Sequence, residues 1–235
     1  MAIALIDMIN VACVYYGNKY KIEYVQKLYS MVKRHLTYPF KFYCFTDHVK
    51  IHKILKEDII FRRFTEQDLQ GWWNKLQLFH PSTPLEGTTL YLDLDVVIMK
   101  RIDEFVEYGD KNEFCIIRDF GQPKAVYNSS IMRFNPQVHS NIIWDNWCKS
   151  KPSLKRLAGD QNVITTIFQR EEYKGKVNNF PDEWTQSYKW THRSDPLTQP
   201  SRRTYELLPN SKIVVFHGSP NPHESTQEWV INNWK

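Results

Sequence analysis

Short apolar runs alternate with amphipathic helical patterns along this chain, and that alternation limits its fold more than any other feature. The runs at 12–16 (ACVYY), 40–46 (FKFYCFT) and 88–95 (TTLYLDLD) are typical of strands. Residues 22–36 carry apolar side chains at three- and four-residue spacing, as a helix does, and Pro39 follows them. Strands that alternate with helices predict an α/β fold with a central, mainly parallel mixed sheet flanked by helices.

Later segments continue the same pattern. We expect further strands at 58–64, 114–119, 130–134 and 212–217, and further helices at 71–79, 138–148 and 159–168. Residues 175–209 are rich in Pro, Ser, Thr and charge, and this composition favours long loops or a lid. No repeat, low-complexity tract or linker interrupts the sequence, so we expect residues 1–235 to form a single domain.

The composition is that of an ordinary globular protein, with 235 residues of which 42% are hydrophobic and 24% charged. No stretch reaches the roughly 18 apolar residues of a membrane span. The apolar N-terminal run lacks a basic region and is interrupted by Asp7, so we expect it to lead into a first strand and not to be a signal peptide. The net charge of +5 is mild and the basic residues are scattered, which argues against a nucleic-acid partner and is compatible with an anionic nucleotide.

The cysteines indicate the redox compartment. Cys13, Cys44, Cys115 and Cys148 lie far apart and show no CxxC spacing, so neither a disulfide framework nor a zinc site is the favoured interpretation. We expect reduced thiols in a cytoplasmic protein.

Two aspartates at alternate positions end the apolar run at 88–95. On a strand, Asp93 and Asp95 would point to the same face, where two like charges repel unless a cation lies between them. Hard divalent ions such as Mg²⁺ and Mn²⁺ prefer such oxygen ligands. A pair of this kind is also explained by turn capping or by ion pairs with Lys100 or Arg101, so it does not establish a metal site by itself.

Other polar residues lie at the expected ends of strands or helices. Asp47, Asp95 and His217 follow strands, and in parallel sheets ligands bind at the carboxyl ends of strands. Lys75 lies on the expected helix before the aspartates. Asp160 begins a later helix, and a role as the N-cap of that helix, with no part in chemistry, is an alternative interpretation of this residue.

Four segments taken together and in order resemble one known family. They are WWNKLQLF with Lys75, YLDLD with the two aspartates, YNSSIMRF followed by GDQNVITTIF, and FHGSPNPHE with His217. This series is similar to that of the glycogenin-like glycosyltransferases, which comprise glycosyltransferase family 8 and its relatives and have the GT-A fold. The resemblance spans nearly the whole chain. It implies a metal-dependent, hexosyltransferase-like enzyme that moves a sugar from a nucleoside-diphosphate donor, with a UDP-sugar as the expected donor, to a carbohydrate or protein acceptor with retention of configuration.

The resemblance also implies roles for individual residues. Asp93, Asp95 and His217 would bind the metal, and a set of mixed oxygen and nitrogen ligands suits Mn²⁺ better than Mg²⁺. Lys75 would meet the diphosphate and, with the metal, stabilise the charge that develops on the leaving phosphate. The nucleotide would be bound by Val14, Tyr15, Tyr16, Tyr20, Asp47, Lys75, Asp93 and Gly218, with Tyr20 stacked on the base.

The donor sugar would be held by a second group of residues, Asn128, Ser129, Asp160 and Gln161. Asp160, Gln161 and Lys75 would be the catalytic residues, and Asp160 is the nearest candidate for a nucleophile. The late motif departs from the family pattern, because Asn221 precedes Pro222 where a lysine is expected. We therefore expect this loop to lack its phosphate contact, unless Lys189 supplies the charge.

Two other function classes compete with this interpretation. An apolar strand followed by DLDVV also resembles the nucleophile motif of haloacid-dehalogenase-type phosphatases, but that motif normally begins the fold, and here long strand and helix segments precede it. A non-catalytic protein that binds a nucleotide sugar on the same fold is the second alternative. Release of UDP from candidate donors distinguishes it from an enzyme.

Overall fold

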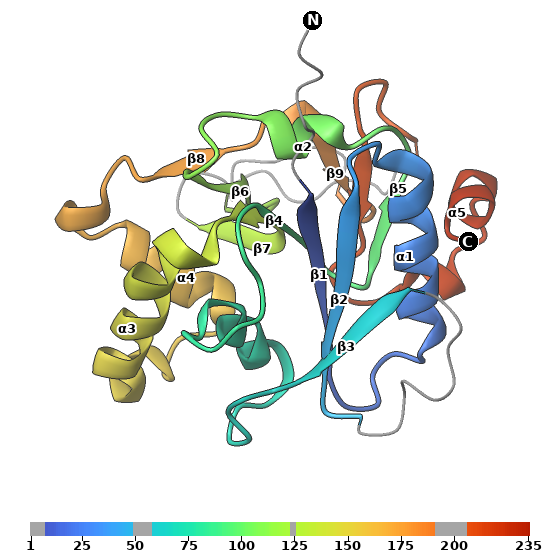
Figure 1. Ribbon diagram of the computed structural model, residues 1–235. Coiled ribbons are helices and arrows are strands. Elements are labelled where there is room, and N and C mark those ends of the chain that lie inside the picture. Colours follow the sequence, from blue (N-terminus) through green and yellow to red (C-terminus); the bar gives the residue numbers. More distant parts are fainter. Residues whose placement is uncertain (1–7, 49–57, 123–125, 191–205) are drawn as a thin grey trace, which may run out of the picture.

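The computed structural model describes residues 8–48, 58–122, 126–190 and 206–235, and within these ranges a seven-stranded sheet forms the centre of the molecule (Figure 1). The strand order is β3-β2-β1-β4-β7-β6-β8. Their bounds are Ile9–Tyr15 for β1, Phe40–Thr46 for β2, Ile59–Arg63 for β3, Thr89–Leu92 for β4, Phe114–Arg118 for β6, Tyr127–Phe134 for β7 and Val177–Asn179 for β8.

The sheet is mixed, with a parallel half at its β3 side. Strand β1 runs parallel to β2 and β4, and β2 runs parallel to β3. Strand β7 is antiparallel to both β4 and β6. A second sheet joins β5 (Val96–Ile98), β10 (Ile213–Val215) and β9 (Thr185–Ser187). The expected α/β fold with a mainly parallel mixed sheet is therefore confirmed.

Helices cover both faces of the large sheet (Figure 1). Helix α1 (Glu23–His35) packs on one face, and the 3₁₀ helix η2 (Gly71–Phe79), α3 (Pro136–Leu154) and α4 (Asp160–Phe168) pack on the other. The remaining helices are α2 (Asp103–Glu107), α5 (Glu228–Asn233), η3 (Glu171–Tyr173), η4 (Asp182–Trp184) and η5 (Pro222–Glu224).

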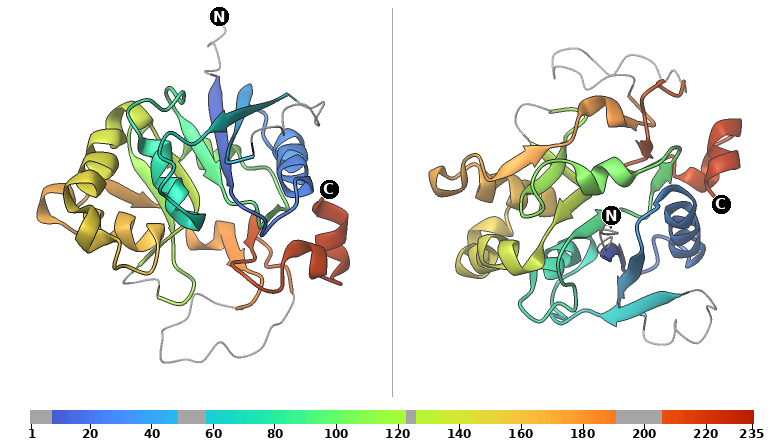
Figure 2. Two further views of the ribbon diagram at one scale, coloured as in Figure 1. Left: turned by 90° about the horizontal axis from the view of Figure 1, so that it is seen from below. Right: turned by 45° about the horizontal axis from the view of Figure 1, so that its top comes forward.

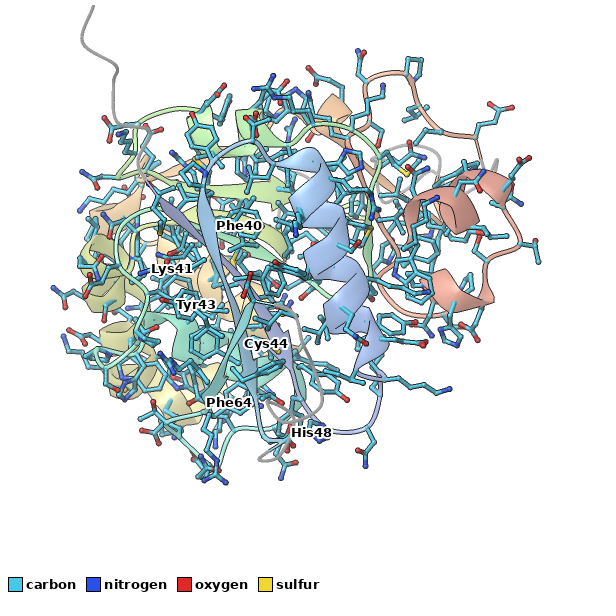
Figure 3. The ribbon with its side chains drawn as sticks, turned by 45° about the vertical axis from the view of Figure 1, so that its right-hand side comes forward. Phe40, Lys41, Tyr43, Cys44, His48 and Phe64 are labelled. Atoms are coloured by element: carbon cyan, nitrogen blue, oxygen red, sulfur yellow. The ribbon has the colours of Figure 1, made fainter. Side chains whose placement is uncertain are left out.

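The alternation of strand side chains explains why two separate cores form. On β1, Val11 and Cys13 enter the core under α1, whereas Ala12 enters the core under η2, α3 and α4. Strand β2 divides in the same way, since Cys44 faces the α1 core and Tyr43 the opposite one. Figure 3 shows these side chains along β2 together with Phe40 and Lys41, and His48 beyond its carboxyl end. Burial on both faces accounts for the nearly unbroken apolar runs in the sequence.

Two sequence expectations need correction. The strand expected to end at Asp95 ends at Leu92 instead, and Asp93–Asp95 form a turn between β4 and β5, which belong to different sheets. The helix at 71–79 is a 3₁₀ helix. Its position is fixed by side-chain amides, because Asn74 donates to the carbonyl of Leu69 and Gln77 accepts the backbone N–H of Glu66 at 2.7 Å.

Most other expected elements are present, and three of them are longer than expected, including β1, which begins at Ile9. Strand β7 begins at Tyr127, and α3 extends from Pro136 to Leu154. Within the segment expected to contain loops, residues 177–187 hold β8, η4 and β9 as well as loops, and residues 191–205 lie outside the described ranges.

Two further expectations concern the cysteine thiols and membrane-spanning segments. Cys13, Cys44 and Cys115 are buried, Cys148 is exposed, and none of these four forms a disulfide. In the described ranges, no helix combines the length and apolar character that a membrane crossing requires.

The C-terminal segment returns to α1. Arg34 on α1 donates to the backbone carbonyls of Asn233, at 2.7 Å, and Lys235. Lys27 lies over the ring of Trp234 at 3.5 Å. Figure 2 shows α5 beside α1 in both of its views.

His139 on α3 makes the stability of the fold depend on pH. Burial of its ring lowers its pKa from 6.5 to about 4, and Nδ1 lies 2.8 Å from the carbonyl oxygen of Asn135. The unfolded chain takes up this proton below about pH 6.5, whereas the folded protein takes it up only below about pH 4, so stability is complete above pH 6.5 and falls toward pH 4. We expect this residue to account for a loss of about 3 kcal/mol at most.

Urea unfolding at pH 7 and at pH 4.5 tests this expectation. The difference in unfolding free energy between the two pH values should be smaller in His139→Gln than in the parent protein. An equal difference in both proteins would assign the acid sensitivity to other groups.

Candidate active site

A cavity of about 750 Å³ opens where β1 and β4 end and α4 begins. It is lined by residues from four regions that are distant in sequence. The first region is the end of β1 and the β1–α1 loop, with Val14, Tyr16, Gly17, Asn18, Lys19 and Tyr20. The second is η2, β4 and the turn after β4, with Gly71, Trp72, Lys75, Tyr91, Asp93, Leu94 and Asp95. The third is β7 and the start of α4 with the residues just before it, Asn128, Ser129, Ser130, Ala158, Gly159, Asp160, Gln161 and Asn162, and the fourth is His217 with Gly218.

The turn after β4 presents both aspartates to this cavity. The backbone N–H of Asp93 donates to the carbonyl of Ser130 at 2.9 Å, which ties the turn to β7. Tyr91 donates its hydroxyl to Asp93 at 2.7 Å, and Tyr20 donates to Asp95 at 2.9 Å. Burial, and then the neighbouring charge of Asp93, raise the pKa of the Asp95 carboxyl, although the hydrogen bond from Tyr20 opposes the increase.

Lys75 joins the aspartates to the start of α4. Its Nζ lies 2.9 Å from Oδ1 of Asp93, 3.7 Å from Oδ2 of Asp160 and 3.1 Å from Oγ of Ser129. Ser129 in turn donates to Asp160 at 2.6 Å. Burial alone would lower the pKa of Lys75, but Asp160 and Asp93 outweigh it and the pKa is raised, so the side chain is an ammonium at neutral pH.

The acidic groups outnumber the ammonium within this network. Asp95 and Asp160 are 6% and 4% exposed, Asp93 is partly buried, and Lys75 contacts two of the three, Asp93 and Asp160. The surplus of negative charge is costly in a buried place, and a divalent cation with oxygen ligands would reduce it. The chemistry of this set of ligands therefore fits Mn²⁺ or Mg²⁺.

His217 lies across the cavity as a neutral ring. Burial, and then the charge of Lys189, lower its pKa to about 4, which leaves the imidazole with a lone pair at neutral pH. Its Nε2 is 2.6 Å from Oγ of Ser187, and the rings of Phe120 and Trp190 lie against it at centroid distances of 5.5 Å and 4.8 Å. In the described part of the chain, no three acidic, histidine or cysteine side chains are close enough to hold an ion as they stand.

The structure, within its described ranges, does not show the ion pairs with Lys100 or Arg101 that could have explained Asp93 and Asp95, or the N-cap role that could have explained Asp160. In the described structure, Lys100 donates to the carbonyl of Pro209, and Arg101 pairs with Asp103. Asp160 is not the N-cap of α4, because that position belongs to Gly159. Asp160 instead points at Lys75, and burial raises the pKa of its carboxyl despite the opposing effect of Lys75 and Ser129.

The expected nucleotide-binding residues divide between two places. Val14, Tyr16, Tyr20 and Gly218 line the cavity with Lys75 and Asp93. Tyr15 does not, because successive strand residues face opposite ways, and its buried ring stacks on His48 with centroids 4.6 Å apart. Asp47 also lies outside the lining, but its carboxylate accepts the backbone N–H of Gly17 at 3.1 Å and so shapes the loop that borders the cavity.

Asp119 is a polar residue of this region that we did not select from the sequence. It follows β6, and its Oδ2 lies 3.4 Å from Nδ2 of Asn128 and 3.5 Å from Nε2 of Gln161. It therefore orients two of the four residues expected to hold the donor sugar. The signal that could have identified it is the strand-end position of the aspartate in FCIIRD, which is the same signal that indicated Asp47.

The late motif has Asn221 where a lysine is expected, and Lys189 from another segment lies beside the motif. Asn221 caps η5, where its backbone N–H and its Nδ2 both donate to Glu224, at 2.5 Å and 3.0 Å. Lys189 lies at the cavity edge instead, with Nζ 2.9 Å from the carbonyl oxygen of His217 and 3.2 Å from the place that a Cβ on Gly218 would occupy. A cation is thus present beside the late motif, but it comes from the segment after β9.

The fold is shared with glycosyltransferases of solved structure. An active-site mutant of LgtC matches 95% of this chain and 93% of its own with a TM-score of 0.66 at 14% sequence identity. GlyE of Streptococcus pneumoniae TIGR4 matches 96% of this chain and 62% of its own with a TM-score of 0.69 at 14% identity. Mouse xyloside xylosyltransferase 1 matches 90% and 98% with a TM-score of 0.56 at 12% identity.

The expected GT-A fold is therefore confirmed, and with it the resemblance to glycogenin-like glycosyltransferases at the level of fold. At such low identity the likeness establishes the fold alone. No family model matches this chain, and no curated protein matches it in sequence. The chain spans about three fifths of the length of GlyE and nearly all of LgtC. LgtC is a galactosyltransferase, and its structure has also been solved in complex with donor and acceptor sugar analogues.

Proposed function

We propose that this chain is a metal-dependent glycosyltransferase that moves a sugar from a nucleoside-diphosphate donor, a UDP-sugar in the first instance, to an acceptor with retention of configuration. The observation that carries the proposal is the acidic network of Asp93, Asp95 and Asp160 around Lys75, at the carboxyl end of β4 in a fold that glycosyltransferases share. A diphosphate and a cation together would match this charge pattern better than either alone.

The metal would be bound at the end of β4. Asp93, Asp95 and the neutral ring of His217 would hold Mn²⁺, and the ion would supply Lewis-acid stabilisation of the leaving diphosphate. Tyr20 keeps Asp95 oriented through its 2.9 Å hydrogen bond, so it has a positioning role besides its expected stacking on the base. Lys75 holds Asp93 and Asp160 at a fixed spacing and offers an ammonium near the bond that breaks.

The sugar would lie between β7 and the start of α4. Ser129 and Asn128 are 2% and 5% exposed and line the cavity beside Asp160. A carboxylate at this place can stabilise positive charge at the anomeric carbon as its bond to the diphosphate lengthens. Asp119 would act through Asn128 and Gln161, whose amides it orients.

A thermal-shift screen tests this proposal. UDP, GDP and a panel of UDP- and GDP-sugars are each added with and without Mn²⁺, since a ligand that binds only the folded state raises the unfolding temperature. We expect stabilisation by a UDP-sugar that depends on Mn²⁺. Stabilisation by no nucleotide in the presence of the metal would contradict the proposal, and hydrolysis of p-nitrophenyl phosphate would favour the phosphatase alternative.

Lys189 should strengthen nucleotide binding by placing a cation beside Gly218. We expect Lys189→Met to weaken UDP binding about fivefold at low ionic strength, because a partly exposed ammonium near a phosphate contributes roughly 1 kcal/mol. The difference between variant and parent should shrink at high salt. Calorimetric titration of UDP with Mn²⁺ saturating measures both effects.

The matched control is Lys174→Met, since Lys174 is an exposed lysine beside Glu171 and is absent from the cavity lining. This control should bind UDP as the parent does. An unchanged affinity in Lys189→Met at low salt would mean that Lys189 does not reach the phosphates.

A further inference from the structure

We propose that Trp72 is the platform of an acceptor subsite, on which a pyranose ring of a carbohydrate acceptor stacks. The inference rests on the proposed function and adds the chemical class of the acceptor to it. The exposed large apolar side chains of the described structure are Met8, Trp72, Val138 and Ile231. Trp72 is 58% exposed, and it is the member of this set that lines the cavity.

The local structure explains why this indole faces outward. Gly71 begins η2 with a φ of +56°, a conformation that favours glycine. Trp73, the next residue, turns inward and stacks on Trp147 with centroids 5.5 Å apart. The tandem tryptophans thus have different roles, since Trp73 contributes to the core under α3 while Trp72 remains at the cavity mouth.

The indole of Trp72 lies against the backbone that leads into α4. A Cβ on Gly159 would be only 3.1 Å from Nε1 of Trp72. The φ of Gly159 is 177°, an extended conformation that any residue can adopt. A side chain at this position would therefore be limited by the indole and not by the backbone. Asp160 follows directly, and the ring is therefore one residue away from the group that faces the reacting sugar.

A polar group accompanies the ring. Asn162, in the first turn of α4, lines the cavity near Gly159 and carries an amide that can hydrogen-bond with sugar hydroxyls. An exposed indole with a neighbouring amide suits a pyranose, which has an apolar C–H face and a polar rim.

The place of Trp72 in the cavity separates this subsite from the donor. The residues expected to hold the donor sugar, including Asp160 and Ser129, are 4% and 2% exposed. The base is expected beside Val14, near the end of β1, and Tyr20, in the loop after β1. Trp72 is 58% exposed, so an acceptor sugar can reach its ring from solvent while the donor occupies the buried part of the cavity.

Saturation-transfer NMR tests the proposal with defined sugars at millimolar concentration. The panel comprises the methyl α- and β-pyranosides of glucose, galactose and xylose, with lactose, maltose and cellobiose, each measured with and without Mn²⁺ and UDP. We expect at least one to bind the parent protein through its C–H protons. Trp72→Ala should weaken this binding about tenfold or more, and Trp72→Phe, which keeps a ring, should retain most of it.

The control variant is Val138→Ala, which alters an exposed apolar side chain outside the cavity lining and should bind as the parent does. The proposal is overturned if no sugar of the panel binds the parent, or if Trp72→Ala binds equally well. Its failure is distinguishable from failure of the proposed function. If only the acceptor subsite is wrong, UDP still binds with Mn²⁺ while sugar binding does not depend on Trp72. If the proposed function is wrong, UDP does not bind.

Discussion

Asp95→Asn should abolish the Mn²⁺-dependent part of UDP binding while the fold remains intact. The substitution keeps the shape of the side chain and an oxygen toward Tyr20, but it removes the charge that a hard cation requires. Because altering even an outer-shell partner of a metal can cost up to a hundredfold in affinity, we expect a loss of about a hundredfold or more for a direct ligand. Calorimetric titration of UDP with Mn²⁺ present and absent measures it.

The same substitution should not destabilise the protein. Burial and the charge of Asp93 raise the pKa of Asp95, so its charged form is disfavoured in the folded protein, and neutral asparagine relieves that repulsion. The matched control is Asp68→Asn, which removes an exposed carboxylate that pairs with Lys151. If Asp95→Asn binds Mn²⁺ and UDP as the parent does, the assignment of this residue to the metal is wrong.

Asp160→Asn should lower turnover by about a hundredfold or more, with little change in UDP affinity. The variant loses the negative charge at the expected place of the anomeric carbon, and loss of one such electrostatic stabiliser typically has an effect of this size. Asparagine can still accept the hydrogen bond from Ser129, and Lys75 retains Asp93 as its partner. Release of UDP from a UDP-sugar, followed under saturating Mn²⁺, gives the rate.

Unfolding measurements on Asp160→Asn separate catalysis from structure. The N-cap of α4 is Gly159, so the variant leaves the capping position unchanged and the unfolding free energy should hardly move. A variant that unfolds as the parent does and keeps full turnover would reduce Asp160 to a structural residue.

Much of the fold was readable from the sequence because apolar periodicity follows burial directly. The expected bounds of the strand at 40–46 and of the helix at 22–36 agree with β2 and α1 to within one residue, since each element packs apolar side chains into a core. The sequence does not reveal where β4 ends, because Asp93 and Asp95 alternate with apolar residues as they would on a continuing strand. The division at Asp93 depends on pairing with different partners, as β4 joins β1 and β7 while β5 joins β10, and such long-range pairing leaves no local signal.

The candidate site shows the same division between local and long-range information. Short motifs identified Asp93, Asp95, Asp160 and Lys75, and the structure brings these four together. The motifs did not reveal that Lys75 bridges two of the carboxylates, because residues from η2, β4 and α4 meet only after folding.

The position of Lys189 also depends on long-range contacts that form only in the folded chain. Lys189 enters the site from the segment after β9, outside every motif, so the sequence named it as an alternative source of the missing charge but could not give its position. The metal roles of the aspartates and His217, the single domain and the identity of donor and acceptor stay predictions.

The most direct test of the account is the release of UDP from a panel of UDP-sugars by the purified protein, with Mn²⁺ and with chelator, alongside Asp95→Asn. We predict that at least one donor is turned over with Mn²⁺, that chelator stops the reaction, and that Asp95→Asn is at least about a hundredfold slower. Binding of UDP-sugars without turnover of any of them would indicate a binding protein. Turnover that is equally fast in chelator or in the variant would contradict the proposed metal site.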